Sequence, residues 1–138
     1  MKYVIPSVLL LTFLSQNALA DEPGKKIDSA LEQCKLNANT TIDTQKCYAS
    51  ATAAWDTELG AQYKLLMQDQ PENVRTALRD SQRQWIKYRD AYNKGIEAFY
   101  QKEQGTIWSL VAAESKMNVI RDKALDLYRL TNSTNLGG

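Results

Sequence analysis

The feature that most constrains the fold of this chain is the helical spacing of its apolar residues. From about Ile27 to Leu130, apolar side chains recur at steps of three and four residues. No stretch in between shows the sustained two-residue alternation of a half-buried strand. The spacing therefore predicts an all-α protein. Short polar connections between the periodic segments are typical of an antiparallel up-and-down helical bundle, here of three to four helices.

The amino terminus has the three-part layout of a secretory signal peptide. Lys2 precedes an apolar run from Val4 to Leu14, and small residues lead up to Ala20, after which cleavage is expected. The apolar run is shorter than the roughly 20 residues that cross a bilayer, so it is interpreted as a removable leader and no membrane span is expected in the mature chain. The expected organisation is a signal peptide at 1–20, one helical domain at 21–130 and a flexible tail at 131–138.

The first two helices are expected to form a hairpin. The first covers about Ile27 to Asn37. Thr40 can cap the second helix, and Asp43, three positions on, can reach back to complete a capping box. This second helix continues to a break at 68–71.

Proline and glycine set the ends of the last two helices. Pro71 is tolerated in a first helical turn and not in an interior, so the third helix is expected from Pro71 to about Lys102. Gly105 then supplies the position that ends helices. Thr106 is expected to cap a fourth helix, which reaches about Leu130.

Cys34 and Cys47 are the two cysteines of a chain that has no histidine. Two thiolates are too few ligands for a zinc site. In a chain exported to an oxidising compartment, a disulfide is the favoured interpretation. The two residues lie about one turn before and one turn after the break between the first two helices, so a hairpin brings their sulfurs together. A bridge that closes a loop of about 14 residues stabilises the fold by about 3 kcal/mol in the chain-entropy model.

The densest aromatic stretch, QWIKYRDAY at 84–92, falls in the third helix. On a helical wheel, the apolar residues within about 40° of Trp85 form a stripe that is predicted to be core. This stripe consists of Val74, Leu78, Trp85, Tyr92, Ile96 and Phe99. Arg89 borders the stripe, and a buried guanidinium needs a carboxylate partner. We expect Glu114 of the fourth helix to pair with Arg89 or with Arg121.

Charge and composition exclude several functions. The chain has 17 basic and 16 acidic residues, and Lys2 is the one charged residue of the leader, so the mature chain carries no net charge. A nucleic-acid binder usually gathers a basic excess on one face, and none is visible. The lack of histidine removes the commonest general base and any Ser-His or Cys-His pair. Neither a phosphate loop nor metal-ligand spacing occurs. We therefore expect a protein that is not an enzyme, with no catalytic residues, no metal and no cofactor.

At several of these residues the chain resembles a family of secreted bacterial proteins, named after the LprI lysozyme inhibitor and its amino-terminal domain. The resemblance rests on the paired cysteines, on Thr40 and Asp43 before the second of them, and on the string Gln-x-x-Trp-x-x-Tyr-Arg-Asp-Ala at 82–91. It covers about residues 28–130. The signature residues, to which we assign a mainly structural role, are Gln82, Trp85, Tyr88, Arg89, Asp90 and Arg121.

The chain departs from this family in one respect. Many members of the family resemble one another in carrying a second pair of cysteines. At the two corresponding places this chain has Tyr92-Asn93 and residues 112–114. It therefore lacks a bridge between its third and fourth helices, and the region 100–109 is expected to be looser than in its relatives.

The resemblance implies a periplasmic or secreted binding protein whose partner is a protein such as a lysozyme or another cell-wall hydrolase. The alternative is an envelope interaction protein: an immunity factor, a chaperone-like subunit or a component of a secretion or transfer apparatus. Exposed aromatic residues would mark a partner surface, although sealing of the bundle ends is the favoured interpretation of these side chains. The candidates for this surface are Tyr48, Tyr100, Lys102 and Trp108.

Overall fold

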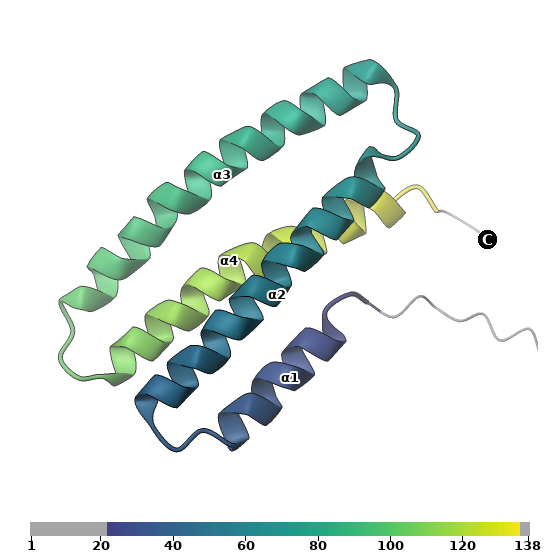
Figure 1. Ribbon diagram of the computed structural model, residues 1–138. Helices are drawn as coiled ribbons and strands as arrows, with labels where there is room; N and C mark the ends of the chain where they lie inside the picture. The colour runs from purple at the N-terminus through teal and green to yellow at the C-terminus, as the bar shows by residue number, and fades with distance from the viewer. Residues whose placement is uncertain (1–21, 136–138) are drawn as a thin grey trace, which may run out of the picture.

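The computed structural model describes residues 22–135, which form four helices and contain no strand. The helices are α1 (Lys25–Leu36), α2 (Thr41–Met67), α3 (Glu72–Gln101) and α4 (Ile107–Asn132), and each runs antiparallel to the next (Figure 1). The predicted all-α bundle is confirmed, and the helix ends lie within two residues of the expected positions. The expected leader, 1–20, and residues 136–138 of the expected tail lie outside the described residues.

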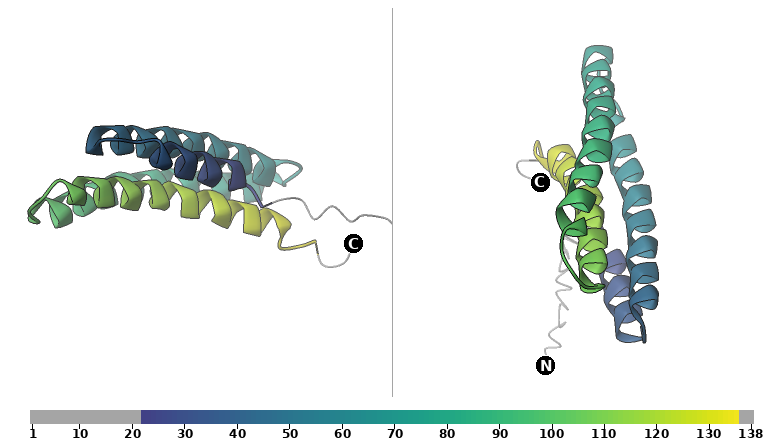
Figure 2. Two further views of the ribbon diagram at one scale, coloured as in Figure 1. Left: turned by 90° about the horizontal axis from the view of Figure 1, so that it is seen from below. Right: turned by 90° about the vertical axis from the view of Figure 1, so that its left-hand side faces the viewer.

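The core lies between α1, α2 and α4. α2 and α4 lie side by side along most of their length (Figures 1 and 2). Trp55 of α2 and Ala124 of α4 are completely buried, and α1 adds Leu31 to the same cluster. The remaining buried members are Cys47, Tyr48, Ala51, Leu59, Leu66, Met117, Ile120, Leu125 and Leu127. Burial of this apolar cluster supplies the main stabilising free energy of the fold.

The third helix contributes little to this core. α3 packs mainly against α4, and Figure 1 shows it apart from α2 along its first half and close to α4 near its C-terminal end. Within α3 only Ile96 is buried. Leu78 and Trp85 are partly buried and pack against the core cluster. An ion pair of 2.8 Å between Glu97 and Lys116 of α4 holds the converging end.

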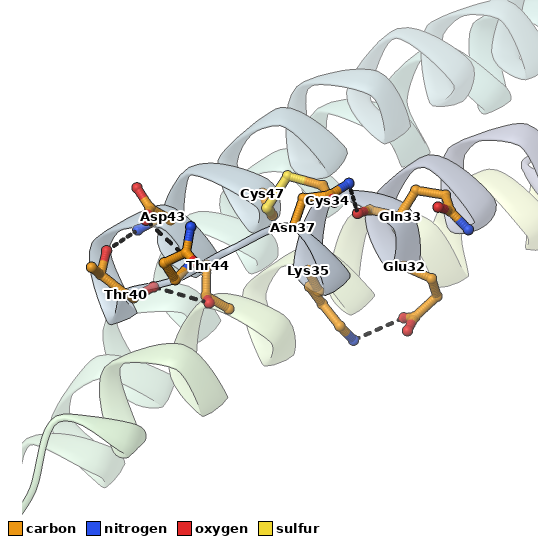
Figure 3. The surroundings of a disulfide bond; sticks show 10 residues. Glu32, Gln33, Cys34, Lys35, Asn37, Thr40, Asp43, Thr44 and Cys47 are labelled. Atoms are coloured by element: carbon orange, nitrogen blue, oxygen red, sulfur yellow. Dashed lines mark hydrogen bonds and ion pairs between the residues drawn. A yellow bond between two sulfur atoms is a disulfide. The ribbon is translucent and has the colours of Figure 1, made fainter.

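The disulfide and the start of α2 close the first hairpin as predicted (Figure 3). Cys34 and Cys47 are bonded, with Cα atoms 5.6 Å apart. The Thr40 hydroxyl oxygen accepts a hydrogen bond of 3.0 Å from the Asp43 backbone N–H. The Asp43 carboxylate accepts one of 3.3 Å from the Asn39 backbone N–H. The Thr40 hydroxyl and then the Asn39 N–H lower the pKa of Asp43, which keeps the cap ionised.

The turn between α3 and α4 corrects one expectation. Gly105 has φ +111°, the left-handed conformation expected of it. Thr106, however, makes no side-chain cap, because it already has helical backbone angles. Its carbonyl oxygen instead accepts a hydrogen bond of 2.7 Å from the Ser109 hydroxyl.

None of the helices between residues 22 and 135 combines the length and apolar character that crossing a bilayer requires.

Candidate functional site

Arg121, one of the signature residues, joins α4 to α1. Its guanidinium donates hydrogen bonds of 3.2 and 2.8 Å to the two carboxylate oxygens of Asp28. It also lies 5.3 Å from the centre of the Trp55 ring. The bonds to Asp28 raise the pKa of Arg121, so the side chain stays charged at any ordinary pH. This arrangement holds α1 beside Trp55, whose side chain is completely buried.

Arg89, the second signature arginine, lies between α3 and α2. It donates hydrogen bonds of 3.0 and 2.8 Å to its neighbour Asp90. Its Nη1 is 4.0 Å from the Asp56 carboxylate of α2. Its guanidinium lies 5.6 Å from the Trp85 ring centre. Of the other signature residues, Gln82 and Trp85 are half-buried, and Tyr88 and Asp90 are exposed.

The expected pairing of Glu114 with Arg89 or Arg121 is wrong. Arg121 pairs with Asp28, and Arg89 with Asp90 and Asp56. Glu114 is exposed, and its charge acts instead on Lys35 and Tyr48. The wheel of one helix does not specify which neighbouring helix faces a given side chain.

Three large aromatic side chains on α3 are exposed to solvent. Tyr88, Tyr92 and Phe99 are 56%, 48% and 57% exposed, and we call them the aromatic row. The rings of Tyr88 and Tyr92 stack at a centroid distance of 5.5 Å. Their exposure shows that the predicted core stripe is wrong for Tyr92 and Phe99. The reason is that α3 has α4 as its main neighbour, so this flank of the stripe has no helix to cover it.

A cavity of about 260 Å³ lies between α3 and α4, beside Tyr88 and Tyr92 of the aromatic row. One wall consists of Trp85, Tyr88 and Tyr92, and the other side is lined by α4. The residues from α4 are Val119, Asp122, Lys123 and Asp126. We call this cavity the aromatic slot. It combines aromatic rings with two carboxylates, a pairing of groups that suits a cation.

A larger groove runs along the other side of α3, between α2, α3 and α4. It consists of two adjoining cavities of about 590 and 620 Å³, both lined by Gln45, Ala113 and Lys116. We call it the interhelical groove. Asn93 lines it, and the Oδ1 atom of this residue is buried without a hydrogen-bond partner.

Between residues 22 and 135 no group of His, Cys, Asp or Glu side chains could hold a metal ion.

The four candidate surface residues occupy different environments. Tyr48 is only 7% exposed and belongs to the core, which corrects its assignment to the surface. Tyr100 and Trp108 are half-buried, and their rings stack at 5.9 Å. The Trp108 Nε1 donates a hydrogen bond of 3.0 Å to the Gln104 carbonyl, which favours a role in closing the turn after α3. Lys102 is exposed, with its Nζ 4.4 Å from the Phe99 ring centre.

Sequence reasoning did not identify which residues lie opposite the aromatic string. Asp122 and Asp126 are recognisable from their spacing as two carboxylates on one helical face, which favours solvated side chains, but the spacing does not place them beside Trp85 and Tyr88. No local signal identifies Asp28 as the partner of Arg121, because 93 residues separate them. The same holds for Asp56, which reaches Arg89 from a different helix.

A protein family and solved structures both match this chain. The family described as Lysozyme inhibitor LprI matches residues 32–127. The crystal structure of an uncharacterised protein from Burkholderia thailandensis is similar, with a TM-score of 0.70 and 28% sequence identity. That alignment covers 81% of this chain and 56% of the other, so this chain spans little more than half the length of that protein. A search of curated proteins found no match.

Proposed function

This chain belongs to the LprI lysozyme inhibitor family, and from that membership we propose that it is a periplasmic or secreted protein that binds and inhibits a cell-wall hydrolase such as a lysozyme. The family match over residues 32–127 is the observation that carries the proposal. It covers α2 and α3 completely, most of α4 and the last five residues of α1. The proposed function therefore belongs to the helical bundle as a whole.

The exposed aromatic row supports a role in binding another protein. Tyr88, Tyr92 and Phe99 lie on one side of a long helix, and a soluble domain that leaves three large rings exposed has surface available for a partner. Tyrosine and phenylalanine are enriched at protein interfaces, since they bury a large area for little loss of side-chain entropy. The row lies away from the core between α1, α2 and α4, so a partner could cover it without unfolding the domain.

Inhibition by binding alone, without catalysis, fits the charged groups that line the grooves. A carboxyl group that acts as a general acid near neutral pH needs a raised pKa. Lys116 instead lowers the pKa of Glu97, which lines the interhelical groove. The Cys34–Cys47 disulfide removes both thiols as nucleophiles and is compatible with an oxidising compartment.

Inhibition assays on a panel of wall hydrolases test the proposal directly. Purified protein, residues 21–138, is added in increasing amounts to several lysozymes and other wall hydrolases, and the turbidity loss of cell walls is followed. We expect at least one enzyme to slow in a saturable manner, with protein reduced and unfolded beforehand as the inactive control. Full rates for every enzyme at a large molar excess would contradict the proposal.

The same aromatic row also favours the alternative, an envelope interaction protein that inhibits no hydrolase. Its partner would then be an envelope assembly rather than a soluble enzyme. Site-specific cross-linking from position 92 in intact cells distinguishes the two functions. A cross-link to a wall hydrolase supports inhibition, and a cross-link to another envelope protein supports the alternative.

A further inference from the structure

We propose that the aromatic slot between α3 and α4 receives a lysine or arginine side chain from the surface of a basic partner protein. The proposal deepens the function above, because it rests on that function for the identity of the partner as a hydrolase. It adds the chemistry by which this face of the bundle recognises that partner.

The first wall of the slot consists of aromatic side chains. Trp85, Tyr88 and Tyr92 line it, and the last two stack with an interplanar angle of 20°. A guanidinium or ammonium group within about 6 Å of the face of an aromatic ring is attracted by the negative potential above the ring. The chain already uses this contact within its own fold: Arg89 lies over Trp85 and Lys102 over Phe99.

The second wall contains carboxylates whose oxygens can still accept hydrogen bonds. The side chain of Asp122 is 74% exposed, and its nearest cation, Arg121, is 4.0 Å away. Arg121 donates its two short hydrogen bonds to Asp28, so it leaves the oxygens of Asp122 available. An incoming guanidinium could bind such a carboxylate through two parallel hydrogen bonds.

Among the described residues that line the slot, Lys123 is the one cation, and it does not cancel both carboxylates. Its Nζ bonds Asp126 at 3.2 Å, while the Asp126 side chain remains 57% exposed. The lining residues thus carry two negative charges and one positive charge. A cation is favoured by this balance and by the rings, whereas an anion is repelled by both. The occupant that the slot fits is therefore a basic side chain.

A direct test uses a small cationic probe on the protein, residues 21–138. The probe is a capped tri-arginine peptide, and the control is the same peptide with citrulline, a neutral isostere of arginine. Side-chain NMR signals of Trp85, Tyr88 and Tyr92 are followed during titration. We expect saturable shifts with the arginine peptide that the citrulline peptide does not produce. Equal shifts with both peptides, or none with arginine, would overturn the proposal.

Matched variants then locate the site. Asp122→Asn with Asp126→Asn should weaken binding of the arginine peptide at least about fivefold, because both charge-assisted contacts are lost. Asp69→Asn with Glu103→Gln changes the net charge equally at exposed positions that do not line the slot. The single variant Asp122→Asn removes an exposed carboxylate with no short ion pair and tests the same point if the double variant unfolds. Equal weakening by the slot variant and the control would overturn the proposal.

A hydrolase assay separates the slot from the proposed function. If wild-type protein inhibits a basic lysozyme and the slot variant inhibits at least about fivefold less strongly, the slot is supported as the docking site. If both inhibit equally, the slot proposal fails and the inhibitory function stands. If neither inhibits while the arginine peptide still binds, the inhibitory function fails and the cation site stands.

Discussion

Arg121 and Asp28 are joined by two hydrogen bonds, of 2.8 and 3.2 Å, across 93 residues of sequence. The pair lies near the start of α1, and the Cys34–Cys47 disulfide lies near its end. α1 has 12 residues, a length at which an isolated helix is marginal in water. The two attachments therefore hold a short helix against α2 and α4 at both ends.

Replacing Arg121 with Met should destabilise the protein by about 1 kcal/mol, since a partly exposed charge pair and a contact with Trp55 are both lost. The melting temperature, followed by circular dichroism, is expected to fall by several degrees. Arg83→Met is the matched control, because the Arg83–Asp80 pair lies on the surface of one helix. A melting temperature equal to that of the control would show that the pair contributes nothing.

Gly24→Ala should lower the free energy of unfolding more than the replacement of Arg121 does. Gly24 has φ +93°, and a Cβ at this position would collide with ring carbons of Trp55. We expect a loss of about 2 kcal/mol or more, from backbone strain and from displacement of the buried ring. Gly60→Ala is the control: nothing lies near its Cβ, and alanine within a helix should stabilise by about 0.5–1 kcal/mol. Urea unfolding midpoints that shift in the same direction for both variants would contradict this explanation.

Reduction of the disulfide should cost about 3 kcal/mol, as the chain-entropy model gives for a loop of this size. Cys34 is exposed, so a thiol reductant can reach the bond without prior unfolding. Urea unfolding with and without reductant measures the effect. The double variant Cys34→Ala, Cys47→Ala should match the reduced protein and not respond to reductant. Coincident unfolding curves for the oxidised and reduced protein would refute the estimate.

Acid should loosen α3 from α4. Lys116 lowers the pKa of Glu97 from its ordinary value of 4.5, so the folded state binds this proton less readily than the unfolded chain. The stabilisation is therefore complete above about pH 4.5 and is lost as the pH falls through the lower pKa of the folded protein. Thermal unfolding of wild type and Glu97→Gln between pH 7 and pH 2 tests this. The stability difference between them should shrink with acid, and a constant difference would argue against the pair.

Replacing Trp85 should lower the free energy of unfolding much more than replacing Tyr88, although the two residues are close in sequence. Trp85 packs against the core cluster, so Trp85→Ala should cost about 2 kcal/mol. Tyr88 is 56% exposed, and Tyr88→Ala should change the free energy of unfolding by less than about 0.5 kcal/mol. Chemical denaturation measures both values. A large loss for Tyr88→Ala would mean that the aromatic row is structural rather than available to a partner.

Local patterns were sufficient to predict the helices and the hairpin. The spacing of apolar residues, Pro71 and Gly105 gave helix positions to within two residues. Thr40 and Asp43 start α2 as expected, since a cap involves only neighbouring residues. The Thr106 cap was predicted from the same kind of signal and does not form. A cap depends on the backbone conformation as well as on the residue type.

The sequence by itself determined the all-α class, the disulfide and the family, because periodicity, caps and residue identities are properties of short segments. The tertiary structure decided what each helical face meets. It assigned Asp28 to Arg121, placed α3 mainly against α4, and left Tyr92 and Phe99 exposed. These outcomes depend on how far each helix is rotated and displaced against its neighbours. A helical wheel gives the direction of a side chain from its own axis, but not the position of the helix that it faces.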